Sequence, residues 1–189
     1  GEDIWRGNEL TPAPTSTTSI PIPADAGDLM TIVSESSADI LTSGTGAWTV
    51  RVHYLDATGA PQTVDVDMNG TTPVDIPVIL MRYIQEMHSV AVGTGGVAAG
   101  HIKIYKTGTA GLVYNMIALG GNQSLVPHRM VPLGKNLILR SWSAAEAANK
   151  RVAFRIRSTD QGGVLLPRIF CFKGTTYLNG SASGEIALN

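Results

Sequence analysis

The chain has 189 residues, a formal net charge of −1 and only 15% charged residues, against about 25% in an ordinary soluble domain. Without a basic excess, binding to a nucleic-acid backbone through bulk electrostatics is not expected. No stretch approaches the roughly 18 consecutive apolar residues of a membrane span, so no membrane partner is expected either. A surface this poor in charge and rich in Gly and Thr is what one expects where neighbouring molecules cover much of it.

The single cysteine, Cys171, excludes an intrachain disulfide. It lies in the apolar run Ile169-Phe170-Cys171-Phe172, where a buried free thiol is the expected state rather than a nucleophile. A protein without disulfides fits synthesis in a reducing cytoplasm.

The first 27 residues differ in composition from the rest of the chain. Residues 10–23 contain four prolines and a Ser/Thr run, which excludes a helix or a central strand and predicts an extended, exposed segment. An apolar group near the start has no local core, so it either packs back onto the parent domain or docks onto a neighbouring subunit. We predict an N-terminal docking arm over residues 1–27 and a β-sandwich domain over residues 28–189. The side chains expected to make the partner contact are Ile4, Trp5, Arg6, Ile20 and Ile22.

From Asp28 onward, short strand-like runs alternate with turn signals. The clearest run is residues 47–55, in which apolar and polar positions alternate as in a half-buried strand. Trp48 falls on its apolar face and is therefore expected in the core. The spacing of runs, roughly one per 10 residues, predicts an all-β, antiparallel, jelly-roll-like sandwich. Residues 56–61 are expected to be a turn that joins this run to a second strand at 64–67 in a hairpin, and Asn69-Gly70 is a further turn signal. The other expected strands include residues 90–92, 102–104, 112–119, 136–142, 150–158 and 164–172.

Two segments have some helical character. Residues 78–87 contain helix formers, but Pro77 precedes them and their periodicity is ambiguous. Residues 143–150 have high helix propensity over only about two turns, which is marginal for an isolated helix, so a loop or single turn is expected. The Gly-rich stretch from Gly93 to Gly100 lacks the Gly-Lys-Ser/Thr and the following helix of a phosphate loop. We expect it to be a flexible hairpin connection.

No constellation of residues predicts catalysis, a cofactor or a metal site. The histidines are His53, His88, His101 and His128. None has the spacing of ligands on one helix face or zinc knuckle, although a metal-binding pair on adjacent strands stays open until the strand pairings are known. Asp65 and Asp67 share one strand face, where they are an acid/base or calcium candidate or simply solvated. Arg151, Arg155 and Arg157, with Arg140 nearby, are either an anion or partner patch or the partners of neighbouring carboxylates.

One set of motifs looks familiar as a whole. It comprises Gly44-Thr-Gly46, the strand-like Val50-Arg-Val-His-Tyr-Leu-Asp56, Met68-Asn-Gly-Thr-Thr-Pro-Val74 and the glycine-rich 93–104 region. Residues 122–125, 131–135 and 141–143 add to the likeness. In order and spacing, residues 28–172 resemble a family of tailed-bacteriophage virion proteins, in which the third and fourth motifs are hairpins.

The resemblance implies a non-enzymatic structural component of the virion, such as a head decoration or cement protein, a head fibre, or a neck or tail attachment. The implied partners are copies of itself, with a trimer expected, and other virion proteins such as the major capsid protein. The alternative is a carbohydrate-binding module for host recognition, with surface glycans as ligands and Trp48 and Trp142 as candidate platforms. A glycan-cleaving enzyme using Asp65 and Asp67 is disfavoured.

Overall fold

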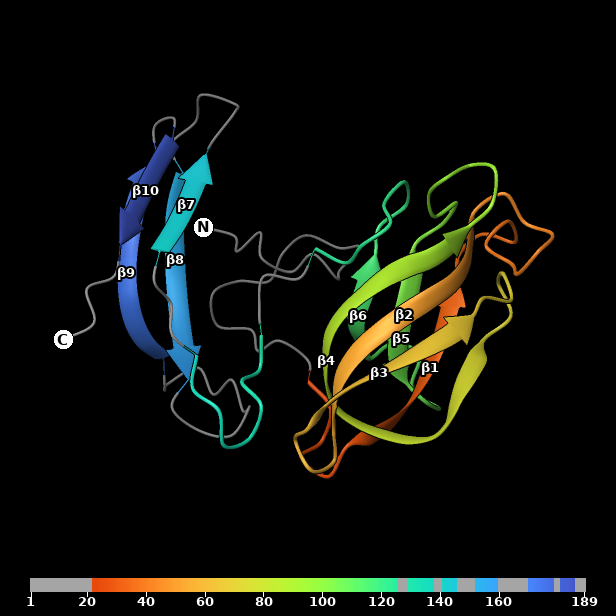
Figure 1. The fold of residues 1–189 in the computed structure, drawn as a ribbon, viewed down its shortest axis with the longest axis horizontal. Helices are drawn as coiled ribbons and strands as arrows, with labels where there is room; N and C mark the ends of the chain where they lie inside the picture. Colours follow the sequence, from red (N-terminus) through yellow and green to blue (C-terminus); the bar gives the residue numbers. More distant parts are fainter. Residues whose placement is uncertain are drawn as a thin grey trace. The chain divides into compact units, whose positions relative to one another are not determined.

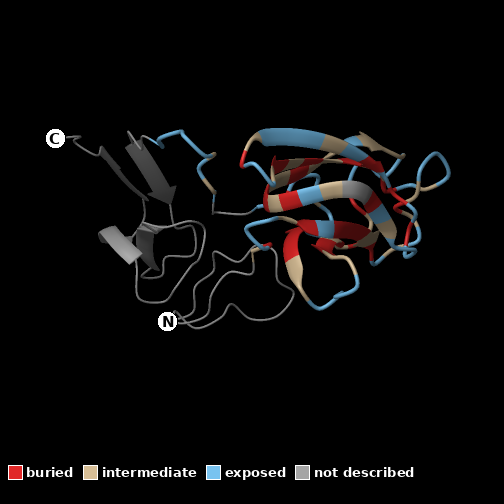
Figure 2. Ribbon diagram, turned by 90° about the horizontal axis from the view of Figure 1, so that it is seen from below, coloured by how far each residue is buried: buried red, intermediate tan, exposed pale blue. Residues whose placement is uncertain are grey.

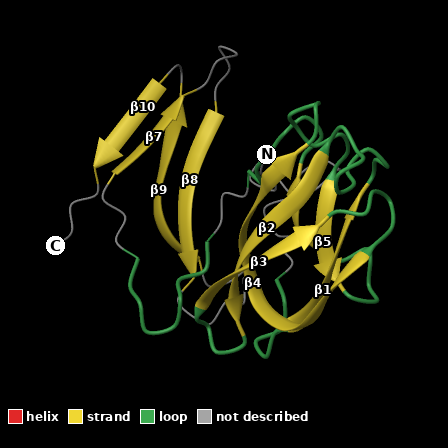
Figure 3. Cartoon of the chain, turned by 45° about the vertical axis from the view of Figure 1, so that its right-hand side comes forward, coloured by secondary structure: helices red, strands yellow, loops and turns green. Residues whose placement is uncertain are grey.

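The protein is all-β, as the sequence predicts. The computed structural model describes residues 22–125, 129–137, 141–145, 152–159, 170–178 and 181–185, and in the last four ranges it describes the course of the backbone. These ranges contain strands and loops but no helix (Figure 3), and therefore no helix that could cross a membrane. The chain forms two compact units, residues 1–133 and 134–189. The predicted arm boundary at residue 27 is a separate division, and it stays a prediction.

Six strands of the first unit form one antiparallel sheet in the order β3-β2-β4-β1-β5-β6 (Figure 1). The strands are β1 Asp28–Ser34, β2 Ala47–Asp56, β3 Pro61–Asp67, β4 Val74–Val92, β5 Ile102–Lys106 and β6 Val113–Ile117. β2 and β3 form the predicted hairpin. The connections from β3 to β4 and from β4 to β5 are not hairpins, because β2 and β1 respectively lie between those strands. The turn expected at Asn69-Gly70 is present, but the hairpin that the resemblance implies there is not formed. The hairpin expected at Gly93–Gly100 is likewise wrong, because this segment is a loop between strands that are not paired.

The long, curved strand β4 organises this sheet. Its first half pairs with β1, from Val74 to Met81, and its second half pairs with β2, from Met81 to Val92. The helix formers at 78–87 therefore belong to a strand, because pairing with β2 from Met81 onward satisfies backbone groups that a helix would otherwise satisfy. Residues just after β6 also bond to β4: the amide of Ser89 donates to the Asn122 carbonyl (2.8 Å) and the amide of Ser124 donates to the Met87 carbonyl (2.8 Å). The sheet thus curls so that β6 and its following segment return to β4.

The inner face of the curled sheet encloses one apolar core. Its strands carry buried positions among less buried ones (Figure 2). The two alternate from Val50 to Tyr54 of β2, as expected for a strand with one face on a core, whereas residues 30–32 of β1 and 114–117 of β6 are buried without interruption. The fully buried side chains that share this core come from five of the six strands and include Met30, Ile32, Val50, Val52, Met87, Ile102, Ile104 and Ile117. The described sheet is consistent with a sandwich, but the finer jelly-roll assignment stays a prediction.

Trp48 departs from the sequence prediction. It is half-buried and lies outside the core, whereas Ala47 and Val50 are fully buried. The pairing register of β2 with β4 shifts on both sides of Thr49. A β-bulge of this kind adds a residue to one strand and interrupts the alternation of faces, so strict alternation cannot be extrapolated back to Trp48. Its indole N–H donates to the Gly44 carbonyl at 2.7 Å.

A buried carboxylate joins the loops at one end of the sheet. Asp39, in the loop after β1, has no exposed surface. Its Oδ1 accepts the amides of Ala47 (2.6 Å) and Ala99 (2.9 Å), and its Oδ2 accepts the amide of Gly100 (2.9 Å) and the hydroxyl of Ser34 (2.5 Å). The backbone carbonyl of Asp39 accepts the amide of Gly70 at 2.7 Å. One residue therefore ties together the connections β1–β2, β3–β4 and β4–β5.

The glycines of the familiar motifs lie around this carboxylate. A Cβ added at Gly46 would lie 2.0 Å from Asp39 Oδ1, and one at Gly93 would lie 2.3 Å from the Gly44 carbonyl oxygen. Gly93 and Gly95 donate their amides to Gly46 and Thr45, each at 2.7 Å. The glycine-rich sequence therefore serves close approach between two loops rather than phosphate binding.

The second unit contains two strand pairs. β7 Ser141–Ala145 pairs with β10 Ser181–Glu185, and β8 Val152–Thr159 pairs with β9 Phe170–Leu178. The strand expected at 150–158 falls at β8. The strands expected at 136–142 and 164–172 overlap β7 and β9 only at their last two and three residues, respectively. The expectation of a loop or single turn over 143–150 is wrong at Ser143–Ala145, which belongs to β7 because it pairs with β10. Cys171 lies in β9, opposite Ser158. The side chains here, including that of Cys171, lie outside the described part, so the buried thiol stays a prediction.

The Asp39 network predicts a large cost for removing its carboxylate. Asp39→Ala leaves three amides and one hydroxyl without their acceptor, and each unsatisfied buried group costs about 1–3 kcal/mol. We expect a loss of at least about 3 kcal/mol in urea unfolding, with earlier hydrogen exchange in β1 and β2 peptides. Asp25→Ala is the control, because Asp25 is 68% exposed and pairs only with Arg82 at 3.0 Å, a contact worth about 0–1 kcal/mol. Equal effects of the two substitutions would contradict the assignment.

The close approach at Gly46 predicts a second, sterically distinct effect. Gly46→Ala drives a methyl group into Asp39, and we expect a loss of about 1–3 kcal/mol or more. Gly111 is the matched control, because its added Cβ meets no atom within 4 Å and its φ is not positive. Gly111→Ala should be neutral or slightly stabilising through reduced entropy of the unfolded chain. Thermal melts of the two variants, measured side by side, check this difference.

Candidate functional site

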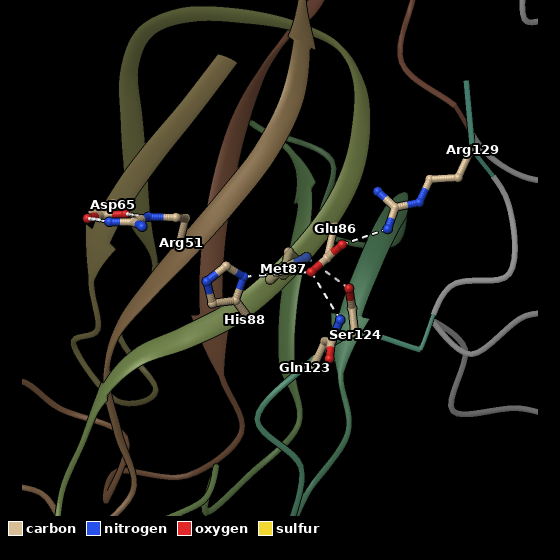
Figure 4. Close-up of polar contacts among 8 residues, drawn as sticks. All are labelled: Arg51, Asp65, Glu86, Met87, His88, Gln123, Ser124 and Arg129. Carbon is tan, nitrogen blue, oxygen red and sulfur yellow. Dashed lines mark hydrogen bonds and ion pairs between the residues drawn. The ribbon is translucent and has the colours of Figure 1, made fainter. Parts of the chain in front are cut away.

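The outer face of β2, β3 and β4 carries the main polar cluster that we describe as the candidate site. Two cross-strand rows build it: Thr63, His53 and Glu86 form one, and Asp65, Arg51, His88 and Gln123 form the other. Figure 4 shows five of these side chains, those of Arg51, Asp65, Glu86, His88 and Gln123. The rows face outward because the intervening residues Val50, Val52 and Met87 are buried in the core. We call this cluster the outer polar face.

The carboxylate of Asp65 is held by Arg51. The guanidinium donates two hydrogen bonds, Nε to Oδ1 at 2.7 Å and Nη2 to Oδ2 at 2.8 Å (Figure 4). The Arg51 hydrogen bond lowers the pKa of Asp65, and the charge of Arg51 adds to that effect. The neighbouring Asp67 accepts the hydroxyl of Thr49 at 2.8 Å. A carboxyl with a lowered pKa is a poor general acid near neutral pH, so this pair offers no acid/base couple.

Glu86 is the centre of a second set of contacts. Its Oε2 accepts Arg129 Nη2 at 2.6 Å, and its Oε1 accepts Gln123 Nε2 at 3.0 Å (Figure 4). The Arg129 hydrogen bond lowers the pKa of Glu86 and outweighs burial, which acts in the opposite direction. His88 Nδ1 lies 3.8 Å from Glu86 Oε1. Segments far apart in the sequence thus meet at one carboxylate.

Two histidines form a stacked pair between these carboxylates. The ring centroids of His53 and His88 lie 5.1 Å apart, with 27° between the ring planes. Sequence analysis left a histidine pair on adjacent strands open, because it could not give the strand pairing that brings His53 beside His88. His101 lies elsewhere and accepts the Leu119 amide through Nδ1 at 3.2 Å. Among the described residues, no three His, Cys, Asp or Glu side chains converge as a metal site.

The other predicted site residues are not brought together here. Ile4, Trp5, Arg6 and Ile20 lie outside the described residues, as do His128, Arg140 and Arg151, while Ile22 is half-buried in the segment before β1. Arg155 and Arg157 lie on β8 with a register shift between Ile156 and Arg157, and their side chains are outside the described part. Sequence reasoning missed Glu86, Gln123 and Arg129. Only the pairing register of β4 with its neighbours brings these residues together, and no local sequence pattern reveals that register.

A buried carboxylate anchors the start of β1. Asp28 accepts Lys106 Nζ at 2.7 Å, the Tyr114 hydroxyl at 3.0 Å and the Ala24 amide at 3.0 Å. Burial alone would raise the pKa of Asp28, but these hydrogen bonds outweigh it and lower the pKa. The residues just before β1 are therefore fastened to the sheet, which gives this cluster a structural role.

The comparisons give no relative from which a site could be transferred. A scan against protein-family models, a search of curated proteins and a search of solved structures each found no match. The site is therefore argued from its own geometry.

The Glu86–Arg129 contact gives a prediction about pH. Because Arg129 lowers the pKa of Glu86, the stabilisation it provides is present above the unfolded-state pKa and is lost as pH falls through the folded-state pKa. Arg129→Ala should raise the pKa of Glu86 in an NMR carboxyl titration. It should also remove the decrease in folding stability that this contact causes as pH falls. Arg82→Ala is the control, since Arg82 pairs with Asp25 instead. An unchanged titration of Glu86 in Arg129→Ala would show that the contact is not formed in solution.

Proposed function

We propose that this protein is a structural component of a tailed-bacteriophage virion, which decorates or stabilises the capsid, neck or tail through subunit contacts. The observation that carries the proposal is a concentration of exposed apolar side chains after β6. Of the ten large hydrophobic residues exposed in the described part, five fall between residues 119 and 137: Leu119, Leu125, Val131, Leu133 and Leu137. Exposed apolar side chains mark interaction sites when they form a contiguous patch, and that the four of the first unit, Leu119 to Leu133, do so is part of the proposal.

The chemistry of the outer polar face supports a non-enzymatic role. Each carboxylate that could act in catalysis accepts a hydrogen bond from a neighbouring side chain. The donor is Arg51 for Asp65, Thr49 for Asp67 and Arg129 for Glu86. Charges that neutralise one another across strands stabilise the pairing of a sheet. The face therefore has an explanation that requires no substrate.

The N-terminal segment supplies the proposed docking contact. Residues 24 and 25 are fastened to the sheet through Asp28 and Arg82, so a docking arm would act from residue 21 backward. Ile4, Trp5, Arg6 and Ile20 carry the apolar contact in this proposal, and Ile22 joins the arm to the body. Copies of the chain, with a trimer as the expected state, and the major capsid protein are the proposed partners.

A truncation tests the arm. Deleting residues 1–21 keeps every described contact, so hydrogen exchange in β1 to β6 should be unchanged. The truncated protein should no longer join particles of the encoding phage that were assembled without it, as measured by co-sedimentation. Full-length Leu41→Ser is the control for a change of exposed apolar surface elsewhere, and it should join particles normally. Normal incorporation of the truncated protein would refute docking by the arm.

The carbohydrate-binding alternative is favoured by one observation. Trp48 is half-exposed outside the core, with its indole N–H fixed to the Gly44 carbonyl, and a fixed aromatic ring is a suitable platform for a sugar. A glycan array with full-length protein and with Trp48→Ala discriminates the two functions. Binding that depends on Trp48 supports the alternative, and absence of binding at high protein concentration supports the structural role.

A further inference from the structure

The stacked pair His53 and His88 has a geometry that the proposed assembly role does not explain. His53 lies opposite Glu86 and His88 lies opposite Arg51, so the two histidines are diagonal neighbours on β2 and β4. Diagonal neighbours are within reach of one another when their side chains are long or aromatic. The core beneath fixes this register, since a slip by one residue would expose Val52 and Met87. The backbone thus holds the two rings together before any ligand arrives.

We propose that His53 and His88 form a two-imidazole site for a divalent transition-metal ion of borderline softness, such as Zn²⁺ or Ni²⁺. Imidazole nitrogen suits these ions. Metal–nitrogen bonds are about 2.0–2.1 Å long, so the two ligating nitrogens must come within about 4 Å of one another. Rings with centroids 5.1 Å apart reach that spacing by small rotations about χ2, a torsion with a broad minimum in histidine.

Glu86 is placed to orient one of the two ligands. Metal-binding histidines generally donate their second ring N–H to a carboxylate or carbonyl, which fixes the tautomer and the ring. Nδ1 of His88 is buried without a hydrogen-bond partner and lies 3.8 Å from Glu86 Oε1. A shift that shortens this distance gives Nδ1 its acceptor and leaves Nε2 of His88 for the metal. Binding of the ion would therefore satisfy a polar atom that is unsatisfied without it.

The charges around the pair set the character of the site. Asp65 and Glu86 would attract a cation, and their partners Arg51 and Arg129 offset that attraction. His88 is 31% exposed and His53 is half-buried, so water can reach the ion and complete its coordination. Two protein ligands with open positions give a modest, exchangeable site rather than a closed structural one.

Calorimetric titration of the full-length protein with Zn²⁺ and with Ni²⁺ at neutral pH tests the proposal. We expect one ion per chain, and a loss of affinity of about tenfold or more in His53→Ala and in His88→Ala, because even a supporting residue of a metal site contributes about 10–100-fold. His101→Ala and His128→Ala are matched controls and should retain wild-type affinity. Glu86→Gln should weaken binding without changing the stoichiometry.

A spectroscopic readout keeps the test independent of folding defects. Ni²⁺ added to the wild-type protein should broaden NMR signals around residues 51–53 and 86–88, and His53→Gln should abolish the broadening while its metal-free melting curve stays unchanged. No binding by the wild-type protein, or binding that survives in both single-histidine variants, would overturn the proposal. Loss of binding only in a control variant would overturn it as well.

Discussion

The first unit depends on the carboxylate of Asp39. This carboxylate accepts backbone amides at the loops that the hydrogen bonds between the loops leave unpaired. Three connections that belong to different strand pairs converge at one end of the sheet, and their amides must find acceptors because unsatisfied buried groups are costly. Asp39 accepts from Ala47, Ala99 and Gly100 and is itself fully buried. This arrangement requires glycine at position 46, since a Cβ there would overlap the Oδ1 atom of Asp39.

With the loops held in place, β4 pairs with β1 along its first half and with β2 along its second half. It leaves β1 and joins β2 near Met81, and the segment after β6 closes on its other edge through Ser124, whose hydroxyl accepts the amide of Met87 at 2.8 Å. The same register that buries Met87 brings His88 beside His53. The outer polar face is thus a consequence of core packing. Two of its carboxylates, Asp65 and Glu86, are each paired with an arginine.

The sequence was sufficient for local features and insufficient for distant ones. Alternation predicted β2 and the β2–β3 hairpin, and turn chemistry predicted the bend at Gly70, whose φ is 61°. Alternation failed at Trp48 because a bulge interrupts it. Helix formers left residues 78–87 ambiguous, because the pairing with β2 that outweighs a propensity of a few tenths of a kcal/mol per residue cannot be seen locally. The hairpin expected after β4, and the one that the resemblance implies after β3, are not formed, since strand order depends on contacts between residues far apart in sequence. Glu86 and Arg129 could not be joined for the same reason.

The exposed apolar segment after β6 constrains how a partner could be held. Burying one leucine side chain contributes about 1.5–3 kcal/mol, whereas association costs about 4–15 kcal/mol in lost translational and rotational freedom. Leu125, 76% exposed, or Leu137, 70% exposed, is therefore too small an anchor when buried alone. Several such contacts made together reach the required range, and an arm that engages the same partner makes the second contact effectively intramolecular. A chain with several exposed apolar side chains along one segment, together with the docking arm that we propose, is thus suited to a partner surface that presents several sites at fixed spacing, as a symmetric assembly does.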